Sequence, residues 1–285
     1  MNAPRKAGMA AVLRPQLSDD GADFAVLLVR RSQRASFMAN AYVFPGGRVD
    51  PSDAEHDPDW PSRYAAAREL AEEAGLLPTS SAVLVRFAQW ITPAAEPKRF
   101  DADCYLVAID ATTARHGDVR VDGHEVFDPL WLTPREALAR YLAGELNLPP
   151  PTVCTIEELE AERVRSLTQL RARGELPPVA TLDTASRLVA TLLRSCASQR
   201  RPHPLLPKLV ADPSGHGIAI VMPWDPGFAS LEGEGSVFAE MAAGGPPVAG
   251  RISRCILKLA KADETYAVRP GQTDSVRWQV ERLTG

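Results

Sequence analysis

The sequence predicts an α/β protein, and three features indicate this class. Residues 24–31 read FAVLLVRR, an apolar run that is typical of a buried strand. Residues 61–74 have the periodicity and the end signals of a helix that is apolar on one side only. Strand-like and helix-like segments then follow one another along the chain. Together these features favour helices packed against a β-sheet.

The composition is that of an ordinary globular protein. The chain has 285 residues, 45% of them apolar, and 36 acidic against 32 basic side chains give a formal charge of -4. A chain of this length can close a core without disulfides. The slight excess of acid argues against a dedicated nucleic-acid-binding protein, because affinity for phosphate backbones comes from a concentrated basic surface.

Nothing in the sequence predicts a membrane protein or a secreted one. No apolar run approaches the roughly 18 residues that a membrane helix needs. The apolar stretch at residues 8–13 ends at Arg14-Pro15, which is too early for the core of a signal peptide. The four cysteines are scattered without a CxxC pair, so reduced thiols are expected. We therefore expect a cytoplasmic protein.

Two strands and a loop are expected before the first helix. Residues 24–31 form the first strand, and residues 41–45 form the second. Gly46-Gly47 then makes a turn. Residues 50–61 are crowded with Asp and Pro, which is typical of a loop.

Local signals at both ends define the helix at residues 61–74. Asp59 is placed to cap its N-terminus. Pro61 lies in the first turn, where its missing N–H costs nothing. Gly75 stands where a left-handed residue commonly ends a helix.

Further strands and another helix are expected after this point. The strand-like segments are residues 82–91, 103–109 and 125–132. Thr133 and Glu136 form a capping box with Pro134 at the first helical position. A helix therefore begins there, and it is expected to end at Gly144.

The remainder of the chain is expected to contain helices and then strands. The prolines at residues 149–151 should run extended as a connector. A second capping box at residues 155–158 begins a helix to about Arg173, and residues 184–196 suggest another. Beyond residue 200 the strand-like runs are residues 217–222, 255–259 and 276–280. We expect one domain over residues 8–200 and a strand-rich segment over residues 201–285, packed on that domain.

Three carboxylates gather on one face of the helix at residues 61–74. At about 100° per residue, Glu69, Glu72 and Glu73 fall within an arc of about 100°, and the opposite arc is apolar. Like charges three or four residues apart on a helix repel each other by roughly 0.2–0.5 kcal/mol per pair. A solvated acidic face is one interpretation. The other is a metal site, because Mg2+ and Mn2+ prefer carboxylate oxygens and commonly bridge to phosphates.

Residues 68–76 read RELAEEAGL, and a strand, a glycine pair and a loop precede them. Here the sequence resembles the Nudix hydrolases, whose box reads G-x5-E-x7-R-E-U-x-E-E-x-G-U, with U a bulky aliphatic residue. From Arg68 onward the match is complete. Upstream it departs, because the five residues after Gly47 lead to Asp53 where the box has Glu, and 14 residues instead of seven separate Asp53 from Arg68. A lengthened loop accounts for this, with Asp53 or Glu55 near the place of the missing glutamate.

The resemblance implies an α/β/α sandwich around a mixed β-sheet that hydrolyses a nucleoside diphosphate linked to another group. It implies Mg2+ or Mn2+ on Glu69, Glu72 and Glu73, with Glu72 and Glu73 as the first choice of ligands. Such ions polarise phosphoryl oxygens and activate a water that attacks phosphorus. Arg68 flanks the cluster and is placed to orient one glutamate. Glu125 is brought in by analogy as a candidate general base, and a surface glutamate at a strand end is its alternative.

A second likeness concerns the substrate. Residues 27–32 and 44–47 read LLVRRS and FPGG, which resembles the signature of coenzyme A Nudix enzymes, L-L-T-x-R-S-x3-R-x3-G-x3-F-P-G-G. Three positions depart from it, at Val29, Ser36 and Asn40. On this likeness the candidate substrate-binding residues are Arg31, Gly46 and Gly47.

Other segments resemble a longer Nudix subgroup that includes peroxisomal enzymes acting on coenzyme A esters and that also carries an insertion in the box. These segments are residues 90–93, 99–101, 131–134 and 148–152. Trp90 and Trp131 are expected to be core residues. Arg99 is singled out for a phosphate contact, because a guanidinium group matches phosphate oxygens, and an ordinary salt bridge is its alternative.

The sequence therefore predicts a metal-dependent pyrophosphohydrolase with a small-molecule nucleotide diphosphate as substrate and with coenzyme A or acyl-coenzyme A as the leading candidate. ADP-ribose, nucleotide sugars and dinucleoside polyphosphates are the alternatives. A Nudix-like binding module without turnover is the rival class, and a purely structural domain ranks last. A homodimer is a further option, for which residues 202–285 are one candidate interface.

Overall fold

The structure is a computed structural model of the chain. It describes residues 3–35, 38–78, 83–94, 96–109, 119–198, 205, 207–211, 217–222, 252–258 and 277–282.

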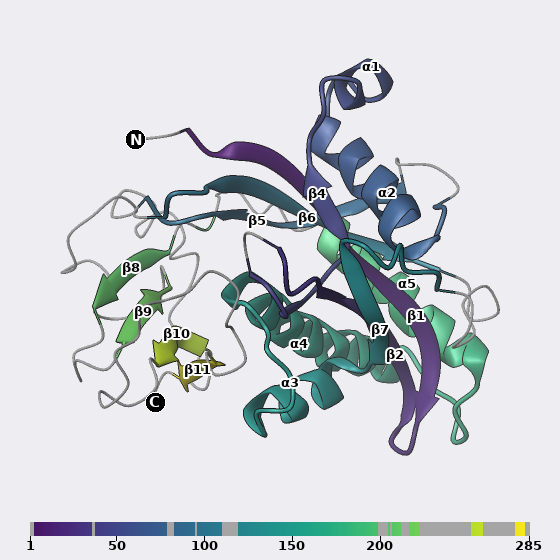
Figure 1. The fold of residues 1–285 in the computed structure, drawn as a ribbon. Helices are drawn as coiled ribbons and strands as arrows, with labels where there is room; N and C mark the ends of the chain where they lie inside the picture. Colours follow the sequence, from purple (N-terminus) through teal and green to yellow (C-terminus); the bar gives the residue numbers. More distant parts are fainter. Residues whose placement is uncertain are drawn as a thin grey trace.

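A mixed sheet of seven strands forms the centre of the chain (Figure 1). Its strands are β1 (Arg5–Ser18), β2 (Gly21–Arg31), β3 (Tyr42–Val43), β4 (Gly46–Arg48), β5 (Val85–Ile91), β6 (Phe100–Ala108) and β7 (Val126–Leu132). The main path runs β3-β2-β1-β6-β5, while β4 pairs with β1 and β7 pairs with β2. Among the described pairs of named strands in this sheet, only β1–β6 is parallel, so the expected mixed sheet is confirmed.

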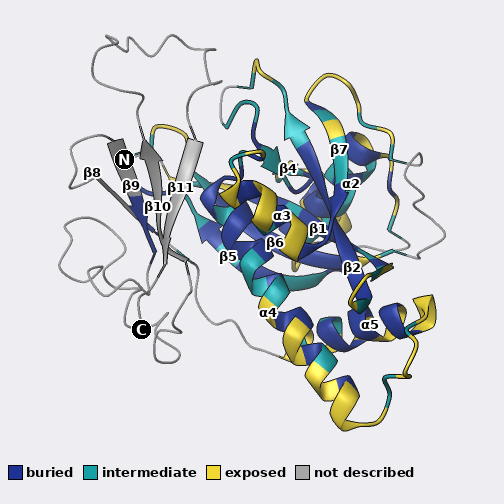
Figure 2. Cartoon of the chain, turned by 90° about the horizontal axis from the view of Figure 1, so that it is seen from below, coloured by how far each residue is buried: buried dark blue, intermediate teal, exposed yellow. Residues whose placement is uncertain are grey.

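Helices cover both faces of this sheet. They are α1 (Asp53–His56), α2 (Pro61–Ala74), α3 (Pro134–Leu142), α4 (Pro150–Ala172) and α5 (Leu182–Ser198). Along β1, Ala10 and Val12 pack in one core with Leu70 of α2, whereas Ala11 and Leu13 pack in the other core with Leu188 of α5. This alternation follows from the period of two in a strand. The expected α/β/α sandwich is therefore confirmed, with α2 on one side and α4 and α5 on the other (Figure 2).

Strand β1 is the central element that the sequence did not predict. It spans Arg5–Ser18 and pairs with β2, β4 and β6. Because both of its faces are covered, its residues do not alternate between apolar and polar. Pro15 lies beyond Leu13, where the described pairing with β6 ends, and it is therefore tolerated in a strand that has β2 alone as neighbour at that point.

Helix α2 has the expected bounds but a different N-terminal cap. Asp59 does not cap it: the N-cap residue is Trp60, without a side-chain hydrogen bond. Asp57 instead accepts hydrogen bonds from the Trp60 amide at 3.1 Å and from Nε of Arg63 at 2.8 Å. At the other end Gly75 has φ 66°, so the left-handed C-cap is confirmed.

The prolines before α4 do not form the extended connector that was expected. Only Pro149 is extended, with φ -64° and ψ 158°, and Pro150 already begins the helix. Prolines fit the first turn of a helix because its N–H groups have no intrahelical acceptor. The capping box expected at residues 155–158 is also wrong, since Thr155 is buried inside α4. The capping box of Thr133 and Glu136 is confirmed at α3.

Two short elements replace expected irregular structure near the glycine pair. Gly46 and Gly47 do not make a free turn but pair with Met9 and Gly8 of β1 as part of β4. The loop that follows contains the one-turn helix α1. Neither element is long enough to leave a periodic pattern in the sequence.

The expected strand-rich C-terminal segment is confirmed as a second sheet. Strands β8 (Lys208–Ala211), β9 (Gly217–Val221), β10 (Ile252–Lys258) and β11 (Arg277–Arg282) are antiparallel neighbours in this order. Leu205 joins the first sheet, because its carbonyl accepts from the amide of Ile91 at 2.8 Å. The domain boundary at residue 200 stays a prediction. No described helix is long and apolar enough to cross a membrane.

The core contains two tryptophans and three of the four cysteines. Trp90 and Trp131 are buried, as expected of core residues. Cys104, Cys154 and Cys196 are free thiols and buried.

Candidate active site

A close contact between β1 and α2 fixes the position of the carboxylate helix. Gly8 lies directly beneath α2, and a Cβ atom at this position would overlap the carbonyl oxygen of Ser62 and lie 2.9 Å from the amide nitrogen of Ala66. Only glycine lets the strand and helix backbones approach this closely. The exposed edge of α2 is thereby held over β4.

Glu73 points into the protein rather than to solvent. Its side chain is buried, and its Oε2 accepts a hydrogen bond from the amide of Gly46 at 2.9 Å. Burial raises the pKa of Glu73 to about 8, and the negative charges of Glu69 and Glu125 act in the same direction. The Gly46 amide and the Arg31 guanidinium oppose this rise. The three glutamates therefore do not share one solvated face, as a simple helical wheel suggests.

Glu69 packs against the second glycine of the pair. A Cβ atom at Gly47 would overlap the Glu69 carboxylate. Burial raises the pKa of Glu69, and the neighbouring Arg68 guanidinium lowers it. The glycine pair thus serves two carboxylates: Gly46 donates to Glu73, and Gly47 leaves room for Glu69.

We expect Gly47→Ala to damage the site without damaging the fold. The new methyl group must displace the Glu69 carboxylate, which is the mobile end of a side chain. A displacement of about 1 Å in a catalytic group can cost about 100-fold in rate. Turnover should therefore fall by about that factor while the melting temperature stays near that of the wild type. A large loss of stability with full activity would contradict this role.

Arg68 connects the cluster to the box loop. Its Nη1 donates to Glu69 at 2.9 Å and to Glu72 at 3.0 Å. Its Nε donates to Asp53 at 3.0 Å, and its Nη2 donates to the carbonyl oxygen of Arg48 at 3.0 Å. Hydrogen bonds with Asp53 are the main cause that raises the Arg68 pKa. The arginine was expected to hold one glutamate, and it holds two.

The two candidates for the first box position differ in their surroundings. Asp53 is fully buried and contacts Arg68, and it also accepts a hydrogen bond from the amide of Asp50 at 2.7 Å. Glu55 is exposed. The lengthened loop thus folds so that the buried Asp53 carboxylate accepts hydrogen bonds from the Arg68 guanidinium.

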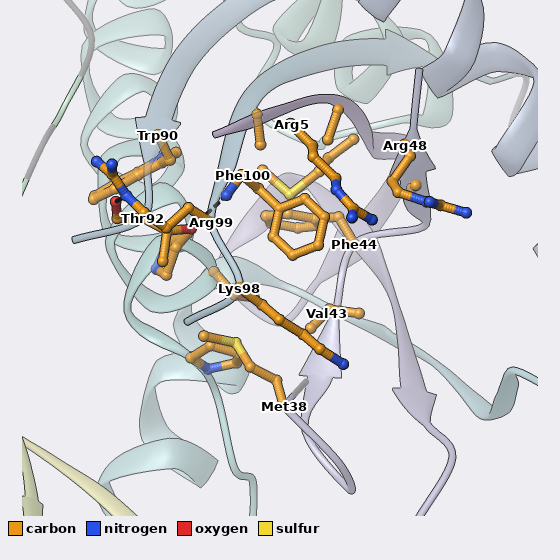
Figure 3. A pocket seen from close by; sticks show the side chains of 18 of the residues that line it. Arg5, Met38, Val43, Phe44, Arg48, Trp90, Thr92, Lys98, Arg99 and Phe100 are labelled. Carbon is orange, nitrogen blue, oxygen red and sulfur yellow. Dashed lines mark hydrogen bonds between the residues drawn. The ribbon is translucent and has the colours of Figure 1, made fainter. Parts of the chain in front are cut away.

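A pocket of about 1070 Å³ opens beside these residues. Eight of the nine predicted site residues line it: Arg31, Gly46, Gly47, Glu69, Glu72, Glu73, Arg99 and Glu125. The ninth, Arg68, contacts Glu69 and Glu72, and Asp53 contacts Arg68 in turn. Arg99 is held in place by a hydrogen bond from its Nε to the carbonyl oxygen of Thr92 at 3.1 Å (Figure 3). The structure thus brings residues from five separate chain segments to one cavity.

Sequence reasoning missed several residues that line the same pocket. Arg5, Arg48 and Lys98 are cations on its wall. Pro207 and Ile220 reach it from the C-terminal segment. No local pattern singles these residues out, because pairings of β1 and contacts of the second sheet bring them there.

The donor chemistry fits a hard divalent cation. Among the residues that the structure describes, no group of three or more acidic, His or Cys side chains is already arranged as a metal cage. Arg68 instead neutralises Glu69 and Glu72 in this arrangement. Glu73 is left as a buried carboxyl group whose charged form is disfavoured by its surroundings. A cation near Glu73 would favour that charged form, and the exposed Glu72 side chain, which Arg68 holds, lines the same pocket.

This arrangement predicts a pH-dependent stability of the metal-free protein. Burial raises the pKa of Glu73 from 4.5 to about 8, so protonated Glu73 favours the folded state. That contribution is fully present below pH 4.5 and is lost as the pH rises through about 8. Thermal unfolding should therefore show a lower melting temperature at pH 9 than at pH 6. Mg2+ competes with the proton, so it should stabilise the protein more at pH 8 than at pH 6; equal stabilisation at both would contradict this.

Comparison with known proteins supports the resemblance to the Nudix hydrolases. The sequence model of the NUDT19 Nudix domain matches residues 4–81, which include the glycine pair and the carboxylate helix. The resemblance to Nudix hydrolases is therefore confirmed for this part of the chain.

Two individual proteins with similar sequences have names that agree with this match. Nudix hydrolase 7 of Caenorhabditis elegans is 30% identical over 168 residues, covering 47% of this chain and 55% of that protein. The acyl-coenzyme A diphosphatase NUDT19 of Xenopus laevis is 23% identical over 239 residues, covering 51% of this chain and 62% of that protein. The chain thus spans between half and two thirds of the length of these relatives. Among solved structures, a Nudix hydrolase from Alicyclobacillus acidocaldarius is 28% identical, with a TM-score of 0.48, over 55% of this chain and 91% of that one.

Proposed function

We propose that this protein is a metal-dependent Nudix hydrolase that cleaves the diphosphate of a nucleoside diphosphate linked to another group. One observation carries the proposal: Glu69, Glu72 and Glu73 of one helix and Glu125 before β7 line the same large pocket. A non-catalytic binding module needs no buried carboxylate supported by a dedicated backbone amide. A purely structural role ranks last, because it gives no reason for four carboxylates to line one cavity.

In this proposal, Glu69, Glu72 and Glu73 would hold Mg2+ or Mn2+, which would supply charge to polarise phosphoryl oxygens and to activate a water molecule. The protein's own residues set the geometry. Gly46 orients the Glu73 carboxylate through its amide, and Arg68 orients the other two glutamates. Glu125 faces the same cavity and stays the candidate to accept a proton from the attacking water.

Coenzyme A or an acyl-coenzyme A ester is the leading substrate. The wall of the pocket combines charged residues with apolar ones, among them Met9, Phe44, Trp90 and Ile220. Such a wall suits a ligand with a phosphorylated end and an apolar end. The name of the Xenopus laevis relative supports the same choice. ADP-ribose, nucleotide sugars and dinucleoside polyphosphates are the alternatives.

A substrate panel tests this proposal. The purified full chain is incubated with coenzyme A, an acyl-coenzyme A, ADP-ribose, a nucleotide sugar and a dinucleoside polyphosphate, each with Mg2+, with Mn2+ and with EDTA. Mass spectrometry should detect cleavage between the two phosphates, and EDTA should abolish it. Absence of metal-dependent cleavage across the panel would overturn the proposal of a hydrolase and favour the hypothesis of a non-catalytic binding module.

We expect Asp53→Asn to reduce turnover about 10- to 100-fold, which is typical when a group that orients a metal ligand is altered. Asp53 accepts from Nε of Arg68, and without its charge the arginine is less firmly held against Glu69 and Glu72. Glu55→Gln is the matched control, because Glu55 lies in the same short helix and is exposed. Steady-state rates compare the two variants. An equal loss in both would contradict the assignment of Asp53.

A further inference from the structure

Two cations line the pocket at a distance from the carboxylates. Arg5 lies at the start of β1, and Lys98 lies just before β6. The parallel register of β1 and β6 pairs Arg5 with Phe100, two residues beyond Lys98. Figure 3 shows the Arg5 and Lys98 side chains on either side of the Phe100 ring, extending past it in the same direction.

The strand register separates these cations from the carboxylate end. Met9 of β1 pairs with Gly46, the residue whose amide holds Glu73. Arg5 lies four residues earlier on the same strand, which corresponds to about 13 Å at 3.3 Å per residue. A diphosphate bound beside Glu73 therefore leaves Arg5 and Lys98 for another part of the ligand.

The charges of Arg5 and Lys98 are not balanced by the described protein residues. Neither side chain forms a salt bridge with a carboxylate in the part of the chain that the structure describes. The neighbouring Lys6, by contrast, pairs with Asp101 at 2.5 Å. Glu96 is the acidic residue nearest in sequence to Lys98 on the pocket wall, and the described structure records no ion pair between the two. Two like charges brought to one wall from distant chain segments favour an anion between them.

We propose that Arg5 and Lys98 form a subsite for a further phosphate, carried on the nucleoside end of the substrate. The partly exposed Phe100 ring between them offers a surface on which the base of that nucleoside stacks. This inference rests on the proposed function and deepens it. In coenzyme A the group that meets this description is the 3′-phosphate of the ribose. The subsite would distinguish such substrates from ADP-ribose and nucleotide sugars, which lack a third phosphate.

The first test compares coenzyme A with 3′-dephospho-coenzyme A, which differ in that phosphate alone. The wild type should have the higher kcat/KM for coenzyme A. In the double variant Arg5→Gln/Lys98→Gln this preference should fall about tenfold, because both exposed cations that would pair with the 3′-phosphate are removed. Turnover of 3′-dephospho-coenzyme A should stay within about twofold of the wild type, because this substrate lacks the phosphate that Arg5 and Lys98 would contact.

Two control variants separate the subsite from a general charge effect. Arg187→Gln on α5 makes the same Arg-to-Gln change as one half of the double variant, on an exposed residue outside the pocket. It should leave the preference unchanged. Lys98→Arg keeps the positive charge and should retain the preference. A wild type that hydrolyses both substrates equally well, or an Arg187→Gln variant that loses the preference equally, would overturn the subsite.

A binding measurement keeps the subsite testable without turnover. Calorimetry on the metal-free full chain compares adenosine 3′,5′-bisphosphate with 5′-AMP. We expect tighter binding of the bisphosphate in the wild type, weakened by added salt and absent in the double variant. Bisphosphate preference without cleavage of any panel substrate would support the subsite and overturn the proposed activity. Cleavage of coenzyme A together with equal binding of the two nucleotides would support the proposed activity and overturn the subsite.

Discussion

Glu73→Gln is expected to lower turnover about 10³-fold, a loss within the range seen when a group that acts on the reacting atoms is removed. The glutamine keeps a carbonyl oxygen that can accept the hydrogen bond from the Gly46 amide at the position of Oε2. It removes the charge that would bind the metal. Burial raises the pKa of Glu73 to about 8, so the loss of its charge should not destabilise the fold.

Measuring both kcat and the melting temperature of this variant separates an effect on catalysis from an effect on folding. We expect the Glu73→Gln melting temperature to be equal to that of the wild type or slightly higher at pH 8, without metal. Glu55→Gln serves as the control, because it makes the same chemical change on an exposed side chain. A strongly destabilised Glu73→Gln protein that keeps its activity would identify Glu73 as structural and remove it from the proposed mechanism.

The carboxylate helix could be predicted because its signals are local. Pro61 and Gly75 mark its ends, and the spacing of the glutamates and alanines defines its faces within a few turns. A helical wheel could not predict that Glu73 is buried. That burial depends on β4, a strand of three residues that exists only through its pairing with β1.

Long-range pairing explains most of what the sequence left out. Strand β1 is buried on both faces in its middle part, so its residues do not alternate between apolar and polar and its length could not be read from them. Arg5 and Lys98 come together because β1 and β6 are parallel neighbours, and no spacing along the chain indicates this. Pro150 and Pro151 predicted an end to helical structure, although prolines suit the first turn of a helix equally well. The candidate site was therefore predictable in its helix and its glycine pair, and unpredictable in its opposite wall.

Gly8→Ala is expected to destabilise the protein by more than about 3 kcal/mol, at or beyond the upper end of overpacking in a core. The added Cβ atom would overlap the carbonyl oxygen of Ser62, and neither can turn aside, because the backbone of β1 fixes the Cβ atom and the carbonyl belongs to the backbone of α2. Helix α2 must then move away from β1, and its carboxylates move with it. Urea unfolding should show the loss as a lower midpoint with an unchanged slope.

Gly174→Ala is the matched control for Gly8→Ala. Gly174 has φ +68°, and a Cβ atom there would meet nothing within 4 Å. Gly174→Ala should therefore lower the free energy of unfolding by about 1–2 kcal/mol, which comes only from placing alanine in a left-handed backbone conformation. A Gly8→Ala variant as stable as Gly174→Ala would mean that α2 can lift from β1 at little cost. In that case the direct contact between strand and helix would not be what fixes the carboxylates over the glycine pair, and β4 alone would have to position them.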